Sequence, residues 1–204
     1  MLTVEPHPLL ELAWLVTRWA GPIGALPEDV ALPAPLPPLP EGHEDAVRAL
    51  LRHGGFKPSG RNKPCNEYIR NAAREGRFPR IHPVVDATNR AVLHGQLPVS
   101  TIDLDRATPP LKVAIAPPGS SYPFNAAGQV IDLGGLLCLW DGWGPCANAV
   151  KDAQRTKTTP ETTRTLSVVW GTTALPGRAS AVAGWLAEMH RRLGAVDTLA
   201  EPSP

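Results

Sequence analysis

Apolar positions along the chain follow two spacings, one typical of strands and one typical of helices. Residues 9–19 mix the two. Leu10, Leu12 and Trp14 alternate as in a β-strand, which is the interpretation we favour, although a short helix also fits this stretch. Helical spacing is clear further on, where apolar faces end at a glycine. These patterns predict helices over residues 43–53, 64–75 and 83–95.

The second half of the chain differs, because short apolar runs there alternate with clusters of Gly, Pro or Ser. A last amphipathic helix is predicted over residues 179–193, where Gly194 ends the pattern. Helices first, strands in the middle and a closing helix indicate an α+β fold, with a mixed or mostly antiparallel sheet flanked by helices. The short runs predict strands over residues 111–116, 129–133, 136–140 and 166–170.

The length of 204 residues suits a single domain. We expect residues 1–42 to supply an N-terminal strand and a proline-rich connector that packs on the domain. Residues 43–195 would form the core, and residues 196–204 a flexible tail. Residues 33–40, Pro-Ala-Pro-Leu-Pro-Pro-Leu-Pro, favour polyproline II. They suit a stiff connector better than a ligand for a proline-recognition module, since no basic residue flanks them.

The three cysteines argue against a disulfide framework or a structural zinc site, because their number is odd and none forms a C-x-x-C pair. We infer a reducing compartment and take it to be the cytoplasm. Cys138 lies in an apolar run and is expected to be buried, whereas Cys146, in Gly-Trp-Gly-Pro-Cys, is expected to be accessible. The start carries no secretory signal, and no apolar run is long enough to cross a bilayer, so we expect no membrane partner.

Local charge is more informative than the net charge of +1, because cations gather in two stretches. Residues 48–80 are rich in Arg and Lys and hold few acids. Clustered cations of this kind hold phosphates, although two solvated helix faces would give the same pattern. Part of the first stretch, 57–64, has the composition of an exposed loop and could grip a phosphate or a carboxylate ahead of a helix. The second stretch contains Lys151, Arg155, Lys157 and Arg164.

Familiar catalytic and cofactor motifs are missing from the sequence. It contains no Walker loop, no G-x-G-x-x-G fingerprint, no G-x-S-x-G elbow and no histidine pair at metal-binding spacing, so we expect no metal and no cofactor. Asp86 and Asn89 lie one turn apart on a predicted helix, with Asp103 and Asp105 beyond it. Such polar groups either anchor a hydrogen-bond network, which we favour, or face a ligand.

Several blocks of sequence, taken in order, carry a resemblance. They are residues 55–70, residues 78–89 with the run Val-Val-Asp-Ala-Thr-Asn, residues 97–105, and the later segments 137–140 and 155–163. In this order they resemble the stand-alone relatives of the editing domain in the phenylalanyl-tRNA synthetase beta subunit. The last two blocks look like that family's late strand and its threonine-rich approach to the final strand. The likeness covers roughly residues 43–172.

This resemblance implies a single α/β sandwich-like domain that binds the aminoacylated end of a tRNA. In the synthetase, the domain hydrolyses wrongly attached tyrosine by attack of water on the ester, which needs a positioned water and donors for the oxyanion but no metal. The chain departs from the synthetase in two places. Ser100 takes the place of a histidine, and the last strand reaches Trp170 without the glutamate that recognises tyrosine. A tyrosine-specific pocket is therefore not expected, and Trp170 would instead form an apolar or stacking wall.

The predicted site lies between the helix of Asp86 and Asn89, a turn at 100–103 and a strand end at 138–143. Ser100 and Thr101 would position the water. The predicted substrate-binding residues are Asp86, Asn89, Asp103, Trp143 and Trp170. The predicted tRNA-binding residues are Lys57, Arg61, Lys63, Arg155 and Lys157.

Three functions remain open on the sequence alone. The first is an editing-like protein that hydrolyses a mischarged aminoacyl-tRNA in trans. The second is a non-catalytic module that binds an amino acid or a tRNA end. The third is a small-molecule enzyme or sensor built on the same fold. The first two share tRNA as the partner, and none of the three calls for DNA.

Overall fold

The computed structural model describes residues 2–202, with side chains as far as residue 199. Within that range the predicted helices all form, and two four-stranded sheets and a two-stranded ribbon pack with them, so the α+β class is confirmed. None of the described helices is both long and apolar enough to cross a bilayer. The helices are α1 (His43–Arg52), α2 (Cys65–Arg74), α3 (Pro83–Gly95) and α4 (Arg178–Arg192), with short 3-10 turns η1 (Ile23–Ala25), η2 (Gly60–Asn62) and η3 (Gln154–Thr156).

Both sheet types named in the prediction occur in the molecule. The strands are β1 (Leu2–Val4), β2 (Leu10–Trp19), β3 (Val99–Asp103), β4 (Leu111–Ile115), β5 (Ser121–Pro123), β6 (Val130–Asp132), β7 (Leu137–Asp141), β8 (Gly144–Asn148), β9 (Arg164–Thr172) and β10 (Ala195–Pro202). One sheet has the order β10-β2-β9-β3 and is antiparallel throughout. The other has the order β1-β4-β7-β8 and is mixed, because β1 and β4 are parallel.

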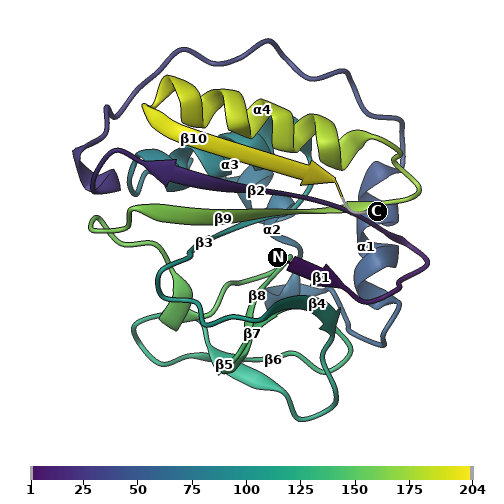
Figure 1. Cartoon of the computed structure of the whole chain (residues 1–204). Helices are drawn as coiled ribbons and strands as arrows, with labels where there is room; N and C mark the ends of the chain where they lie inside the picture. Colours follow the sequence, from purple (N-terminus) through teal and green to yellow (C-terminus); the bar gives the residue numbers. More distant parts are fainter. Residues whose placement is uncertain (1, 203–204) are drawn as a thin grey trace.

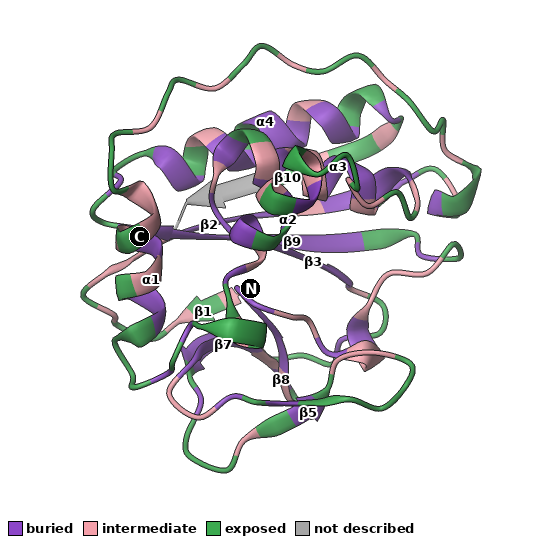
Figure 2. Cartoon of the chain, turned by 180° about the vertical axis from the view of Figure 1, so that it is seen from behind, coloured by how far each residue is buried: buried purple, intermediate pink, exposed green. Residues whose placement is uncertain are grey.

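The helices cover the antiparallel sheet, as Figure 1 shows, with α4 lying along β10 and β2 and α3 packed against α4. The second sheet lies on the opposite side of β9 from α4 (Figure 1). The close approach of α3 to α4 requires glycine at position 95, because a Cβ there would lie 2.5 Å from Cγ2 of Val182. The predicted apolar face of α4, including Val182, Trp185 and Met189, is buried (Figure 2). Burial of this face against the sheet is the main source of stability for the helix layer.

Several strands escaped the sequence analysis. β3 was expected as a turn, yet all five of its residues are buried and pair with β9. The strand was hidden because Ser100, Thr101 and Asp103 interrupt its apolar pattern, and each of these polar groups is satisfied by hydrogen bonds inside the protein. The strand that follows β7 was missed too, and it buries Cys146. The expectation that Cys146 is accessible was therefore wrong, while Cys138 is buried as predicted.

The segment expected as a flexible tail is a strand over most of its described length. Gly194, with φ of +99°, reverses the chain after α4, and β10 then pairs antiparallel with β2 from Trp19 to Ala13. The prediction failed because composition and chain position say nothing of an unpaired edge on β2 that a following segment can complete.

The proline-rich segment lies across the outside of α4 (Figure 1). Its carbonyl groups accept hydrogen bonds from side chains of that helix: Trp185 Nε1 donates to Ala34 at 3.0 Å, and Arg178 donates to Pro37 at 2.6 Å. Arg192 donates to the carbonyls of Ala31 and Leu32, the two residues just before the segment. This geometry favours a surface connector over a free ligand for another protein.

Candidate functional site

A cleft of 770 Å³ opens beside α2 and α3. Its walls come from η2 and α2, from the segment 75–82 and the first turns of α3, from β3, and from the connection 150–158 that follows β8. The predicted site residues Arg61, Lys63, Asn89, Thr101 and Lys157 all line it. The cleft borders two of the three predicted elements, α3 and β3, whereas the strand end at 138–143 does not line it.

Cations outnumber acids along the cleft, which Glu75 and Asp152 also line. Arg61, Lys63, Lys151 and Lys157 form no ion pair with any side chain that the structure describes, whereas Arg77 pairs with Glu75. Lys157 donates from Nζ to the carbonyl of Phe124 at 2.6 Å, and Lys151 Nζ lies 4.3 Å from the centre of the Phe124 ring. Unpaired cations gathered in a concave site attract a polyanion.

The charges of this group act on one another. Burial, and secondly the positive charge of Arg61, lower the pKa of Lys151 from its usual value. Two cations that repel each other in the free protein would gain most from an anion placed between them.

A chain of hydroxyl groups runs from the floor of the cleft, at Thr88 and Thr101, into the protein at Ser167. Thr101 Oγ1 lies 2.8 Å from both Thr88 Oγ1 and Ser167 Oγ. Thr88 donates its proton to the carbonyl of Val84, one turn back in α3. The remaining directions follow from the single proton on each hydroxyl: Ser167 donates to Thr101, and Thr101 donates to Thr88. Thr101 therefore has no proton left for a ligand and offers one lone pair, which suits it to accept from a water or an ammonium group.

Asp152 is a cleft residue that the sequence analysis did not single out. It lines the cleft, half-buried, and its carboxylate accepts from the backbone N–H of Asn148 at 3.2 Å. Burial raises the pKa of Asp152 to about 6, against the opposing effects of the Ser100 hydroxyl, the Asn148 N–H and the Lys157 charge. A carboxyl group in a cleft with such a pKa can accept a proton near neutral pH. The available signal was a single acid inside an otherwise basic stretch of sequence.

Ser100 and Trp170 are neighbours, but both lie behind the cleft wall. The Ser100 hydroxyl donates to the carbonyl of Asn148 at 3.0 Å and accepts from Trp170 Nε1 at 3.0 Å. Both side chains are almost fully buried, and neither lines the cleft. Ser100 also lies next to Asp152, but its single proton goes to Asn148, and Trp170 is a core residue that donates to the serine.

Two of the predicted acids serve the fold. Asp86 accepts from Arg80 Nε at 2.6 Å and from the backbone of Ile81 at 2.8 Å, which ties the segment before α3 to the helix. Asp103 accepts from the Thr162 hydroxyl at 2.6 Å at the end of β3. The favoured interpretation of these acids as network anchors agrees with these contacts. Asn89, in contrast, faces the cleft.

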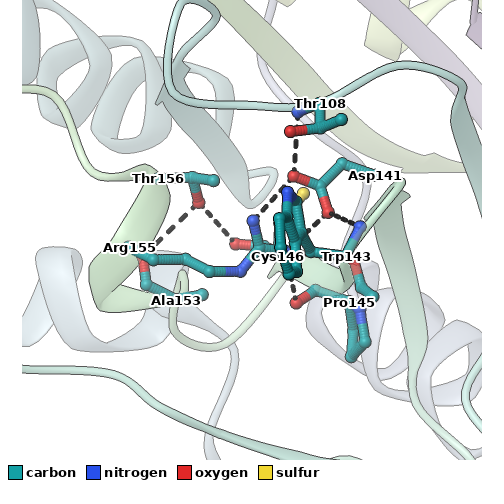
Figure 3. Close-up of polar contacts among 9 residues, drawn as sticks. Thr108, Asp141, Trp143, Pro145, Cys146, Ala153, Arg155 and Thr156 are labelled. Carbon is teal, nitrogen blue, oxygen red and sulfur yellow. Dashed lines mark hydrogen bonds and ion pairs between the residues drawn. The ribbon is translucent and has the colours of Figure 1, made fainter.

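Arg155 was expected to hold tRNA, but its guanidinium group is engaged elsewhere. It forms a two-pronged ion pair with Asp141, at 2.6 and 2.7 Å, and its Nη2 also donates to the carbonyls of Gly144 and Pro145 (Figure 3). The Asp141 side chain is fully buried and also accepts from the backbone of Thr108. Burial alone would raise the pKa of Asp141, but Arg155 and two backbone N–H groups hold that pKa below its usual range.

Two other predicted residues lie apart from the cleft. Trp143 is highly exposed in the turn between β7 and β8, and its backbone donates to Asp141 (Figure 3). Lys57 is exposed in the loop before η2 and does not line the cleft. Sequence proximity to the correct segments placed both residues in the prediction, although their side chains point to other parts of the surface.

Comparisons with known proteins show a likeness of fold to solved structures. No protein-family model matches the chain, and no curated protein matches its sequence. Among solved structures it is similar to an N-terminal fragment of the phenylalanyl-tRNA synthetase beta subunit from Pyrococcus horikoshii, with a TM-score of 0.50 and 10% identity. The match covers 100% of this chain and 54% of that one, so the chain spans about half the length of the fragment. The likeness is one of fold. It agrees with the fold that the sequence resemblance implied.

Proposed function

We propose that the cleft binds the aminoacylated end of a tRNA and hydrolyses the ester bond there. The observation that carries this proposal is that one cleft holds both cations without an ion-pair partner and the carboxylate of Asp152, whose pKa suits it to accept a proton. Cations suit the phosphates of an RNA end, and a base is what the hydrolysis of an ester requires. The fold of the synthetase fragment adds support from an independent direction.

The proposed reaction uses groups that already face the cleft. A water molecule donates one hydrogen bond to Asp152 and one to the free lone pair of Thr101. As the water oxygen bonds to the ester carbonyl carbon, Asp152 takes the proton. The carbon–oxygen bond to the ribose then breaks, and the ribose oxygen takes the proton back from Asp152, which releases a free amino acid and a deacylated tRNA. The positive charge of Lys157 near Asp152 favours the negative charge that develops on the carbonyl oxygen.

A non-catalytic binding module is the second candidate, and one observation favours it. The hydroxyl protons of Ser100 and Thr101 are both committed to internal acceptors, so neither can act as a nucleophile or donate to an oxyanion. A protein of this kind would bind the RNA end with the same cations and release it unchanged.

The test is the deacylation of a panel of correctly charged and mischarged tRNAs by the purified protein. We expect loss of one mischarged species well above spontaneous hydrolysis, with a rate that rises with pH through an apparent pKa of about 6. Asp152→Asn should lower the rate by about 100-fold or more, the usual effect of removing a general base. Asp132→Asn is the matched control, because Asp132 is exposed on the β6 hairpin, away from the cleft.

The outcomes separate the three functions. Full deacylation by Asp152→Asn would exclude Asp152 as the base, and full deacylation by Ser100→Ala would show that the reaction does not need Ser100. Tight, salt-sensitive binding of tRNA without turnover would establish the binding module. Salt-insensitive or absent tRNA binding would point to a small-molecule enzyme or sensor.

A further inference from the structure

Tyr68 is an aromatic residue whose exposure the packing of the protein does not explain. It lies on α2, whose neighbouring positions Glu67 and Ile69 are buried, yet 62% of its own surface is exposed. Among the described residues its hydroxyl makes no hydrogen bond, and the ring lines the mouth of the cleft. Ile81, from the segment before α3, lines the same cleft with 66% of its surface exposed. Large apolar side chains left in solvent at the mouth of a cleft mark a binding surface.

The charges around this apolar surface indicate what it would bind. Arg61 and Lys63 lie just before α2, and Lys151 and Lys157 line the same cleft. An aromatic face bordered by unpaired cations fits a flat, uncharged ring attached to an anionic backbone, since the ring stacks while the cations hold phosphates. A free amino acid would use neither the row of cations nor an exposed ring outside the catalytic floor.

We infer that Tyr68 is a stacking platform for an unpaired nucleobase at the 3′ end of an RNA, with Ile81 as an apolar contact for the same nucleotide. This inference rests on the proposed function and names the part of the substrate that the cleft mouth recognises. In this arrangement the base stacks outside the cleft, the adjacent phosphates lie on Arg61 and Lys63, and the terminal ester reaches the floor of Thr101 and Asp152. Stacking is tolerant of base identity, so the subsite selects an unpaired end more than a sequence.

The inference is tested by fluorescence anisotropy with a 5′-labelled single-stranded RNA dodecamer that carries no amino acid and ends in cytidine-cytidine-adenosine. Tyr68→Ala should raise the Kd about 5- to 150-fold, the range found for the loss of one stacked base. The salt dependence of binding should stay unchanged, because no charge is removed. Tyr68→Phe should bind like the natural protein, since the ring remains. Val130→Ala is the control for loss of an exposed apolar side chain, because Val130 is 60% exposed on β6, away from the cleft.

A second RNA isolates the stacked base. The same dodecamer with an abasic 3′-terminal nucleotide should bind the natural protein more weakly by a similar factor, and Tyr68→Ala should weaken it no further. Unchanged Kd in Tyr68→Ala, or an equal loss in Val130→Ala, would overturn the inference, as would a Tyr68→Ala effect that persists in full on the abasic RNA. A deacylation assay keeps the two proposals apart: loss of the platform raises KM and leaves kcat intact, whereas failure of the proposed function leaves no turnover in any variant.

Discussion

At the scale of single residues, the floor of the cleft illustrates how counting protons constrains chemistry. Thr101 and Ser100 were chosen from the sequence as groups that position water, and the internal acceptors of both leave them able only to accept hydrogen bonds. The ability to take a proton falls instead to Asp152, whose burial raises its pKa to about 6. A carboxylate that destabilises the fold when it is ionised is most simply understood as kept for its chemistry.

The pH dependence of stability tests this view of Asp152. The Asp152 carboxyl ionises near pH 4 in the unfolded chain and near pH 6 in the folded protein. The natural protein therefore loses stability as the pH rises through this window, and the loss persists above it. Asp152→Asn should therefore be more stable than the natural protein at about pH 8, by about 2–3 kcal/mol at most. Below about pH 4 the difference should vanish. Urea unfolding across this range measures it, and a difference that is constant with pH would contradict the assignment.

At the scale of elements, the ion pair between Arg155 and Asp141 fastens the segment around η3 to the hairpin of β7 and β8 (Figure 3). Arg155→Ala would leave the fully buried Asp141 carboxylate without its cation, so we expect a loss of about 3 kcal/mol in the free energy of unfolding. Thermal or urea unfolding measures the loss.

Two variants control that experiment. The double variant Arg155→Ala with Asp141→Asn should recover part of the stability, because the unpaired charge is gone. Arg164→Ala breaks an ion pair with Asp105 in which both partners are well exposed, and it should cost no more than about 1 kcal/mol. Equal losses in Arg155→Ala and Arg164→Ala would show that the buried pair does not hold the hairpin in place.

The elements also show what the sequence could reveal. The helices were predictable from the helical period of their apolar residues, and β4, β7 and β9 from short apolar runs between turn residues. β2 mixes the two periods, and its alternating residues favoured a strand. β3 could not be found that way, since a fully buried strand can hide Ser, Thr and Asp when other parts of the chain satisfy them. Only some of the residues that line the cleft could be predicted. Clustered charge marked Lys63 and Lys157, and the family resemblance marked Thr101. Only the tertiary structure could show that Arg155 faces Asp141 and that Asp152 faces the cleft.

At the scale of the whole molecule, a net charge of +1 conceals a strongly basic cleft. If the cleft cations hold RNA phosphates, the logarithm of the binding constant should fall linearly with the logarithm of salt concentration, by about 0.7 for each phosphate held. Lys63→Ala should reduce that slope by about 0.7. Lys112→Ala removes an exposed cation from β4, outside the cleft, and should leave the slope unchanged. An equal effect of the two variants would show that general surface charge, and not the cleft, attracts the RNA.

The pairing of β2 with β9 has a consequence for how the protein is made. Leu10 lies opposite Thr172, and Arg18 lies opposite Arg164, so the central pair of the antiparallel sheet joins segments from opposite ends of the chain. During synthesis on the ribosome, β2 is made before β9 and α4, so its apolar side chains remain exposed to solvent until those elements have been translated. The nascent chain thus passes through an interval in which β2 has no native partner, and protection by a chaperone would matter most in that interval.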